Sequence, residues 1–275
     1  MKVKLFDKKL IQKFYGVLSI IGTVTSLILI FVDIPLASKS WIGIISLILL
    51  VICYIYIWYK SNNINNLELN IEGSPLEIKF GDLFKEDGLK VIAFNEYFDT
   101  QVDNIIIARN SLNGFFIENY INDIIEFDDR ISNDTHLNEK TIDTNITRKA
   151  GKTTQYKLGS IFVYEDFLLT AFSHFDKKNR AYLSMQDYIG CLLEFWNEID
   201  IIYAGRTIVL PLLGSGITRF KGYENVSEQE LLEIILWSFK VSRIKFRYPS
   251  KVKIVISNDK KDKISLFNIL KFDYK

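Results

Sequence analysis

Two long runs of this chain contain no charged residue. The first extends from Phe14 to Val32 and the second from Ser40 to Tyr59, and Pro35 lies in the short turn between them. Each run is close to the ~20 residues that a helix needs to cross a hydrocarbon core. Proline stops a helix because it lacks the backbone N–H and clashes with the preceding turn. The pattern predicts a transmembrane hairpin in residues 1–60, with spans at about 14–32 and 40–59.

The distribution of basic residues predicts how this hairpin is oriented. Five lysines precede the first span and Lys60 closes the second, whereas the turn offers only Lys39. An excess of Lys and Arg marks the cytoplasmic side. We therefore expect a multi-pass protein of the cell inner (plasma) membrane with both termini in the cytoplasm. A cleaved signal peptide would need a small-residue cleavage site, which is absent. A buried helical hairpin of a soluble protein remains the open alternative.

Small residues on the two spans, such as Gly16, Gly22 and Gly43, provide faces on which helices can approach closely. Two spans alone make a poor pore. A membrane function beyond anchoring would therefore require several copies of the hairpin.

Residues 67–275 read as a soluble α/β domain that follows a polar linker at 61–66. Short apolar or alternating runs typical of strands occur at 67–71, 76–80, 90–94, 155–163, 167–173, 207–212 and 251–257. A helix is expected from Asn113 through Ile125, and two more begin at Ser184 and Ser227, each with a capping-box pattern. Residues 133–152 are poorly patterned and read as a loop of low order. Alternating strands and helices indicate a sheet covered on both faces.

Composition excludes several classes of function. The formal net charge is +1, and no basic stripe interleaved with aromatic residues is present, so nucleic acid is not expected as a partner. Cys53 lies in a predicted span and Cys191 in a predicted helix, which indicates no disulfide framework and agrees with a reducing compartment. With only two histidines, His136 and His174, a metal site is not expected, and we interpret His174 as structural. No catalytic residue and no cofactor are assigned.

The strongest local signal follows the apolar strand at 207–212. Two glycines separated by one residue, Gly214 and Gly216, come directly after Pro211, Leu212 and Leu213. Such a turn lets backbone N–H groups converge on an anion. The spacing fits neither a Walker loop nor the dinucleotide-binding fingerprint. By itself the motif is weak, and an ordinary turn at a strand exit remains possible.

A second segment makes a phosphate site more plausible, because the two together resemble a known domain. Gly81-Asp82-Leu83-Phe84, followed by Lys90-Val-Ile-Ala-Phe-Asn95, is similar to the opening of macro domains. Val209-Leu-Pro-Leu-Leu-Gly-Ser-Gly-Ile217 is similar to the second, phosphate-binding loop of that family. The resemblance covers nearly all of the chain from about Leu67. It implies a three-layer α/β/α sandwich with a mixed sheet.

A macro domain preceded by two spans resembles the membrane-anchored effector family of type II Thoeris antiphage defence. That resemblance implies an effector whose cytoplasmic domain senses an NAD-derived ADP-ribose signal, histidine-ADP-ribose, made by a partner TIR-domain enzyme. The implied ligand is thus a nucleotide of the ADP-ribose type. Binding would then cluster the hairpins in the lipid bilayer as a homo-oligomer and lead to membrane disruption and abortive infection, through cell death or growth arrest.

The resemblance also implies a set of ligand-binding residues. Asp82, with Leu83, would accept a hydrogen bond from the adenine amino group, and Asn95 would lie near the distal ribose. The first phosphate-facing loop would contain Asn113 and Gly114. Leu213, Gly214, Ser215, Gly216, Ile217 and Thr218 would wrap the diphosphate, with Arg219 as a bidentate partner and Phe220 stacking at the rim. Asp82 capping a turn and Asn95 as a generic loop residue are the competing readings.

The chain also departs from the pattern of hydrolytic macro domains. Those end the first strand with two asparagines around small residues and then a glycine run, whereas this chain has Phe94-Asn95-Glu96-Tyr97 and later Ser111-Leu-Asn-Gly-Phe115. Sensing without catalysis is therefore the preferred interpretation. A membrane-tethered ADP-ribosyl hydrolase is the alternative, and a ligand-free membrane scaffold is a third possibility.

Overall fold

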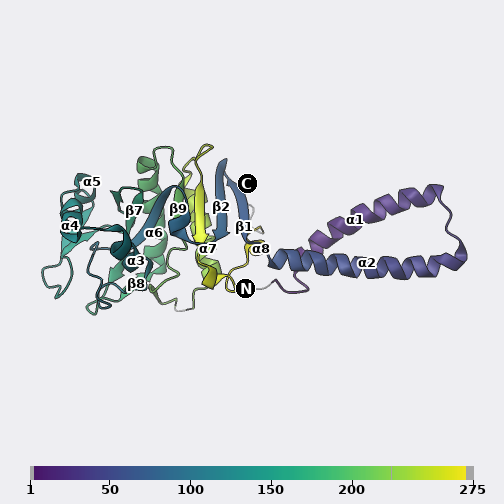
Figure 1. Cartoon of the computed structure of the whole chain (residues 1–275), viewed down its shortest axis with the longest axis horizontal. Helices are drawn as coiled ribbons and strands as arrows, with labels where there is room; N and C mark the ends of the chain where they lie inside the picture. Colours follow the sequence, from purple (N-terminus) through teal and green to yellow (C-terminus); the bar gives the residue numbers. More distant parts are fainter. Residues whose placement is uncertain (1–2, 224, 271–275) are drawn as a thin grey trace. The chain divides into compact units, whose positions relative to one another are not determined.

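A computed structural model describes residues 3–223 and 225–270 of the chain (Figure 1). The residues form two compact units. Of the described residues, 3–65 and 264–270 belong to the first unit, and 66–223 and 225–263 to the second. The second unit begins where the sequence places the start of the soluble domain. Residues 264–270, which the sequence assigns to that domain, group with the helical hairpin.

The first unit is dominated by two long helices, α1 (Lys8–Phe31) and α2 (Leu36–Asn62). The Asp7 carboxylate caps α1 by accepting hydrogen bonds from the backbone N–H groups of Lys9 and Leu10. Both helices are long and apolar enough to cross a membrane, with mean hydropathies of 2.1 and 2.5 over windows that are 0% and 6% buried. A core hairpin of a soluble protein would be mostly buried, so this exposure does not fit that alternative.

A small cluster of contacts lies where α1 begins and α2 ends. Trp58 donates a hydrogen bond from Nε1 to the Val3 carbonyl over 2.9 Å, and the Val3 N–H donates to Oδ1 of Asn62 over 2.7 Å. The short helix α8 (Leu266–Ile269) adds Phe267, which packs with Val3, Leu10 and Ile57. We call these contacts the hairpin base. The base ties both ends of the described chain to the end of α2.

The second unit is built on a nine-stranded mixed sheet. Its main path runs β1-β2-β11-β9-β3-β7-β8-β10, and β6 pairs with β7 beside that path. The central strands β2, β11, β9, β3 and β7 are parallel, whereas β1, β6 and β8 pair antiparallel with their neighbours β2 and β7. The strands are β1 (Asn66–Ile71), β2 (Ser74–Phe80), β3 (Leu89–Asn95), β6 (Ile161–Tyr164), β7 (Phe167–Phe175), β8 (Ala181–Ser184), β9 (Ile208–Pro211), β10 (Arg219–Lys221) and β11 (Val252–Ile256).

Helices cover the sheet because its strands are apolar on both faces. Alternate side chains such as Ile92, Leu169 and Val255 share a core with α3 and α4, and their buried neighbours Val91 and Leu168 point to the opposite face. On that face α6 contacts β7 and β8 and packs against α7. The helices are α3 (Leu112–Tyr120), α4 (Ile124–Ser132), α5 (Thr135–Asn138), α6 (Met185–Ile202) and α7 (Glu228–Ser242).

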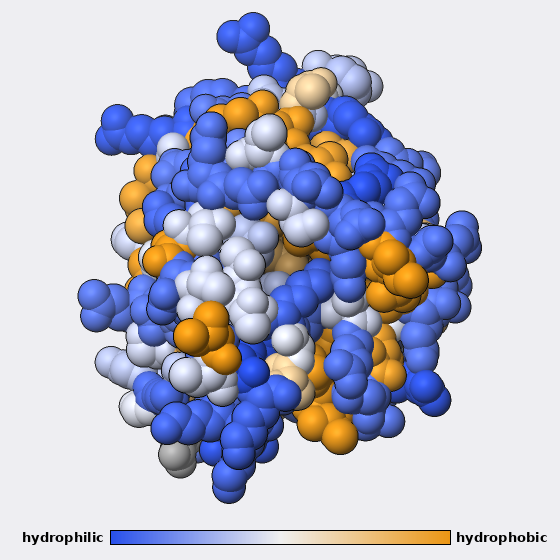
Figure 2. Space-filling model, turned by 90° about the vertical axis from the view of Figure 1, so that its left-hand side faces the viewer, coloured by the Kyte–Doolittle hydropathy of each residue, from blue (hydrophilic) through white to orange (hydrophobic). Residues whose placement is uncertain are grey.

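The outer surface of this unit differs in character from the hairpin. Figure 2 shows one face of the molecule on which hydrophilic residues predominate and apolar residues lie in scattered spots. Single exposed apolar residues are ordinary on a soluble domain. Exposed large apolar side chains are instead concentrated along α1 and α2.

Most local predictions are confirmed. The capping boxes at Ser184 with Asp187 and at Ser227 with Glu230 are both formed and begin α6 and α7. The single helix expected from Asn113 through Ile125 is wrong. It ends at Tyr120, because Asp123 accepts hydrogen bonds from the next N–H groups and caps a separate helix, α4.

The prediction of low order for residues 133–152 is also wrong. This stretch contains α5 and the strand β4 (Thr141–Thr144), which pairs with β5 (Thr154–Tyr156). It is held by Arg148, whose guanidinium contacts both carboxylate oxygens of the buried Asp99, at 2.5 and 3.0 Å. Two charges far apart in the sequence form this tie, so local patterning could not reveal it.

A second buried carboxylate joins three strands behind the loop that follows β3. Glu96 is 2% exposed and accepts hydrogen bonds from the Gln155 side chain and from the Phe175 N–H, at 2.6 and 3.1 Å. His174 lies 2.5 Å away through Nδ1. This hydrogen bond to the Glu96 carboxylate raises the pKa of His174, against the opposing effect of burial. The interpretation of His174 as a structural residue agrees with these contacts.

The Asp99–Arg148 pair gives a first testable expectation. Arg148→Met leaves Asp99 buried without its counter-charge, so we expect unfolding to become easier by about 3–5 kcal/mol. Chemical denaturation of the full chain in detergent micelles measures this. Arg109→Met is the matched control, because Arg109 forms an exposed pair with Glu118 at 2.7 Å and should cost less than about 1 kcal/mol. Equal effects of the two variants would contradict the interpretation.

The Glu96–His174 contact predicts a pH dependence. Because the folded state raises the pKa of His174, the contact stabilises the fold fully below the ordinary pKa of 6.5 and loses this effect as pH rises through the higher folded-state value. In a His136→Gln background one imidazole remains, and NMR titration should show His174 titrating above 6.5. Glu96→Gln should lower that pKa. An unchanged midpoint in Glu96→Gln would refute the assignment.

Candidate functional site

A cavity of about 700 Å³ lies where the parallel strands end. Its walls come from the residues after β2, β3, β9 and β11, together with the loop that leads into α3. Parallel strands deliver their carboxyl ends to one edge of a sheet, and open α/β sheets bind ligands at that edge. The volume is within the range of sites that hold a small molecule or nucleotide.

The structure brings most of the predicted residues into this cavity and leaves three outside its wall. Those in the wall are Asp82, Leu83, Asn95, Asn113, Leu213, Gly214, Ser215, Gly216, Ile217 and Thr218. Arg219 and Phe220 line a neighbouring cavity of about 560 Å³ that shares the glycine loop. Gly114 is buried in the first turn of α3, where an added Cβ would lie 2.4 Å from the Ala108 carbonyl oxygen. Its role is close packing beneath the cavity.

The loop after β9, residues 212–218, is fixed through its carbonyl groups. The Tyr188 hydroxyl donates to the Leu213 carbonyl over 3.0 Å, and the Ser215 hydroxyl donates to the Leu212 carbonyl over 2.6 Å. Lys260 donates from Nζ to the Ser215 carbonyl over 2.6 Å. Because these three contacts engage oxygens, they hold the loop without consuming its N–H groups.

The N–H groups of this loop are available to a ligand. Among the residues that the structure describes, those of Gly214, Gly216 and Ile217 donate to no acceptor, whereas that of Ser215 donates to the Leu212 carbonyl. Unpaired backbone donors beside a cavity suit an anion such as a phosphate. The loop therefore has the chemistry of a diphosphate cradle.

The two glycines of this loop serve different purposes. Gly214 has φ +84°, and a Cβ there would come within 3.0 Å of the Phe220 ring and 3.3 Å of Tyr188. At Gly216 an added Cβ would meet no atom within 4 Å. Gly214 is thus required by the backbone and its neighbours. Gly216 instead keeps the cavity open, so a side chain introduced there would enter the space available to a ligand.

Phe220 supports the loop from within. It is 8% exposed, and its ring meets that of Tyr188 edge-on at 5.3 Å, on the side of Gly214. The expected stacking at the rim does not fit this placement, since the ring is already packed against protein atoms.

The placement of Asp82 is compatible with both interpretations that the sequence left open, a cap of a turn and an acceptor for an adenine amino group. One carboxylate oxygen accepts the Phe84 N–H over 3.0 Å and caps the short 3-10 helix η1 (Leu83–Lys85). The other oxygen lies 3.8 Å from the Lys85 ammonium, and the side chain is 48% exposed. This second oxygen remains accessible to a donor such as an adenine amino group.

Asn95 lies in the wall, but its side-chain amide is already engaged. Its Nδ2 donates to Asp99 over 2.8 Å, and its Oδ1 accepts from the N–H groups of Tyr97 and Asp99 at 2.9 and 3.3 Å. Those bonds fold the loop after β3. Because Oδ1 already accepts two bonds, the expected contact of the Asn95 side chain with a distal ribose is limited to the second hydrogen of Nδ2. Asn95 therefore shapes the wall from behind.

Asn113 is a stronger candidate for that contact. Its Oδ1 is buried and has no hydrogen-bond partner within the described part of the chain, although it lines the cavity. A buried acceptor left unpaired is costly, so a ligand hydroxyl that donates to it would recover that cost. The side chain comes from the first turn of α3, which Ser111 caps.

Sequence reasoning missed the wall contributed after β11. Ser257, Asn258, Asp259 and Lys260 line the cavity from the short 3-10 helix η2 (Asn258–Lys260). The signal available was the position of these residues directly after a predicted strand at 251–257. Their polar, lysine-rich sequence is typical of a solvated turn, so the sequence did not indicate that they line a cavity.

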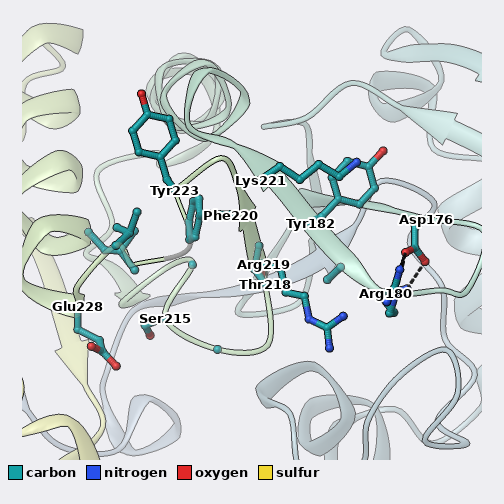
Figure 3. Close-up of a pocket in the computed structure, with 15 residues that line it drawn as sticks. Asp176, Arg180, Tyr182, Ser215, Thr218, Arg219, Phe220, Lys221, Tyr223 and Glu228 are labelled. Atoms are coloured by element: carbon teal, nitrogen blue, oxygen red, sulfur yellow. Dashed lines mark hydrogen bonds and ion pairs between the residues drawn. The ribbon is translucent and has the colours of Figure 1, made fainter.

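The neighbouring cavity is lined by charged and aromatic side chains (Figure 3). Asp176 and Arg180 pair with each other, and the Arg180 contacts lower the pKa of Asp176 to about 2. The Lys221 ammonium lies 3.3 Å from the centre of the Tyr182 ring. Figure 3 shows the guanidinium of Arg219 reaching away from Phe220, and Arg219 is exposed. It forms no salt bridge with any residue that the structure describes.

No group suited to hold a metal ion is found: within residues 3–223 and 225–270, three His, Cys, Asp or Glu side chains nowhere gather in a suitable way. The carboxylates in the wall of the first cavity are Asp82 and Asp259. A hydrogen bond from the Ser257 side chain lowers the pKa of Asp259. A lowered pKa makes a carboxylate a weaker general base.

Comparison with known proteins identifies the domain. Residues 76–257 match the family model described as Thoeris protein ThsA, Macro domain. The Thoeris protein ThsA of Bacillus amyloliquefaciens (strain Y2) is 41% identical over 276 residues, which cover 97% of this chain and 91% of that protein.

Two solved mutants of the Oceanobacillus iheyensis macrodomain are structurally similar. They are 14% and 13% identical with TM-scores of 0.45 and 0.46, covering 72% and 76% of this chain and 88% and 96% of theirs. The macro fold expected from the sequence is confirmed by the family match and by the mixed sheet. The chain is a member of the Thoeris ThsA family, and the cavity described above belongs to its macro domain.

Proposed function

We propose that this protein is an antiphage defence effector whose macro domain is a receptor for an ADP-ribose-type signal. The ligand proposed is histidine-ADP-ribose, supplied by a partner TIR-domain enzyme. Binding clusters the transmembrane hairpins in the cell membrane, and the resulting membrane disruption stops growth or kills the infected cell. Both termini lie in the cytoplasm, where the signal is made.

One observation carries the binding step: the loop after β9 presents N–H groups without acceptors to a cavity at the carboxyl edge of a parallel sheet. A diphosphate is negatively charged and needs several donors in place of water. Lys260 in the wall adds a positive charge, because its ammonium donates to the Ser215 carbonyl of this loop. Asn113 and Asp82 supply an acceptor each, for a ribose hydroxyl and an adenine amino group.

The membrane step is supported by the exposure of the hairpin. Both helices present apolar side chains around their length, and the small residues Gly16, Gly22 and Gly43 have no atom near their Cβ positions. Close helix packing is therefore open to other copies. A ligand shifts such an equilibrium only by binding the clustered state more tightly than the dispersed one. To move from 1:99 to 99:1 the difference must be about 5.5 kcal/mol.

Gly216→Asp tests the receptor site. The position has room for a side chain, and a carboxylate about 4 Å from a phosphate in a partly buried site is repelled by about 4 kcal/mol. We expect the affinity for ADP-ribose and for histidine-ADP-ribose to fall by about 100-fold or more. Isothermal titration calorimetry on the full chain in detergent micelles measures this.

Gly216→Asn is the matched control, because it adds nearly the same shape without the charge. A fall that is much smaller than for aspartate indicates electrostatic repulsion at the diphosphate. If both variants bind as tightly as the parent chain, the loop does not hold the ligand and the proposal is wrong.

The alternative, a membrane-tethered ADP-ribosyl hydrolase, is favoured by the two carboxylates in the wall, Asp82 and Asp259. Hydrolysis requires a base with a pKa near the operating pH. The pKa of Asp259 is lowered and Asp82 caps η1, so neither is prepared for that role.

We therefore expect no release of ADP-ribose when the full chain is incubated with an ADP-ribosylated peptide at the same concentration as the protein. Liquid chromatography with mass detection follows the product, and Asp259→Asn is the control. Multiple turnovers that vanish in Asp259→Asn would establish the hydrolase instead.

A further inference from the structure

The chain segment 257–270 runs from the wall of the cavity to the hairpin base. Residues 257–260 line the cavity in the second unit, and residues 264–270 belong to the first unit. We call residues 257–270 the C-terminal strap. Within the described residues it is one of two covalent connections between the units, the other being residues 63–65 after α2.

At its cavity end the strap is tied to the glycine loop and to α7. Lys260 donates to the Ser215 carbonyl over 2.6 Å and lies 3.9 Å from the Glu228 carboxylate. Lys263, the last residue of the second unit, pairs with the same carboxylate at 2.7 Å. Ser215 and Glu228 both line the neighbouring cavity (Figure 3). The hydrogen bond from Lys260 to the Ser215 carbonyl therefore couples the position of the glycine loop to that of the strap.

At its other end the strap is held by the hairpin base. Phe267 is 5% exposed and packs against Val3, Leu10 and Ile57, and the Lys13 ammonium lies 6.0 Å from the centre of its ring. Leu10 and Lys13 belong to α1 and Ile57 to α2. One side chain of the strap thus contacts both helices of the hairpin.

Little slack separates the two attachments. Four residue steps lead from Lys260 to Ile264, and they span at most about 14 Å. They are shortened further, because the Lys261 N–H donates to the Asn258 carbonyl and the Lys263 N–H to the Lys260 carbonyl. The other connection enters the edge strand β1, and no residue of β1 lines the cavity.

We propose that the C-terminal strap is the element that transmits occupancy of the cavity to the hairpin. This inference rests on the proposed function, and it names the regulation of that same site. A diphosphate that binds the N–H groups of Gly214 and Gly216 repositions the intervening Ser215 carbonyl. Lys260 follows its acceptor, and the displacement passes through residues 261–263 to Phe267 and so to α1 and α2.

The test lengthens the strap without removing a contact. A Gly-Ser-Gly-Ser insertion between Lys263 and Ile264 keeps both attachments but adds about 13 Å of slack. The full chain is reconstituted in phosphatidylethanolamine–phosphatidylglycerol liposomes as donor- and acceptor-labelled copies, and histidine-ADP-ribose is the probe. Energy transfer between copies reports clustering, and calorimetry in detergent reports binding.

We expect the insertion variant to bind the probe within about twofold of the parent chain and to lose most of the ligand-dependent rise in energy transfer. The same insertion in the exposed turn at Glu72 and Gly73 is the matched control and should cluster normally. Phe267→Ala should behave like the insertion and Phe267→Leu like the parent. Hydrogen exchange of residues 264–270 should change on probe binding in the parent chain only.

Failure of this inference differs from failure of the proposed function. A parent chain that does not bind the probe would overturn the proposed function, and the inference with it. A parent chain that binds and clusters, with a strap insertion that clusters equally, would overturn the inference alone. Loss of clustering from an insertion between Asn63 and Ile64, with the strap insertion silent, would overturn it too, because the signal would then travel through β1.

Discussion

The cavity depends on how the carbonyl groups of one loop are held. Leu212, Leu213 and Ser215 each present a carbonyl to a donor from another part of the loop or fold: the Ser215 hydroxyl, the Tyr188 hydroxyl and the Lys260 ammonium. Since a peptide is rigid and planar, fixing its oxygen also fixes the direction of the next N–H. Donors that are held near their binding positions need only a small rearrangement when an anion arrives. The unpaired N–H groups of this loop are therefore a property of the whole fold, because α6 and η2 supply the donors that hold them.

A second constraint lies behind the loop that follows β3. Glu96 and Asp99 are 2% and 1% exposed, and each is surrounded by donors that come from residues about 50 to 80 positions away. Burying a carboxylate is costly unless its hydrogen bonds are satisfied. These two residues tie the 145–152 segment, β5 and β7 to the end of β3. Donors from distant residues therefore hold the loop near Asn95, and the unpaired Oδ1 of Asn113 lines the same cavity.

What the sequence could predict was local. The hairpin follows from uncharged length, the strands from apolar runs, and the starts of α6 and α7 from Ser184 and Ser227 with their partners three residues on. The glycine loop was recognisable because Gly214 needs a positive φ after a buried strand. The details that differ depend on side-chain geometry that a residue pattern does not show: Asn95 hydrogen-bonds to Asp99, Phe220 packs under Gly214, and Gly114 has no room for a Cβ beside the Ala108 carbonyl. The attachment of Phe267 to Leu10 joins opposite ends of the chain, and no local pattern announces it.

The hairpin base satisfies backbone polar groups at the beginning of the chain with side chains of α2. The Val3 N–H donates to Asn62, the Val3 carbonyl accepts from Trp58, and the Leu5 carbonyl accepts from Tyr54. The beginning of the chain is therefore fastened to the end of the second span, and Phe267 packs into the same cluster. Packed clusters of this kind change between discrete arrangements because they do not deform continuously. If the strap transmits occupancy as proposed, a displacement of Phe267 acts on α1 and α2 together, because Phe267 packs against both helices.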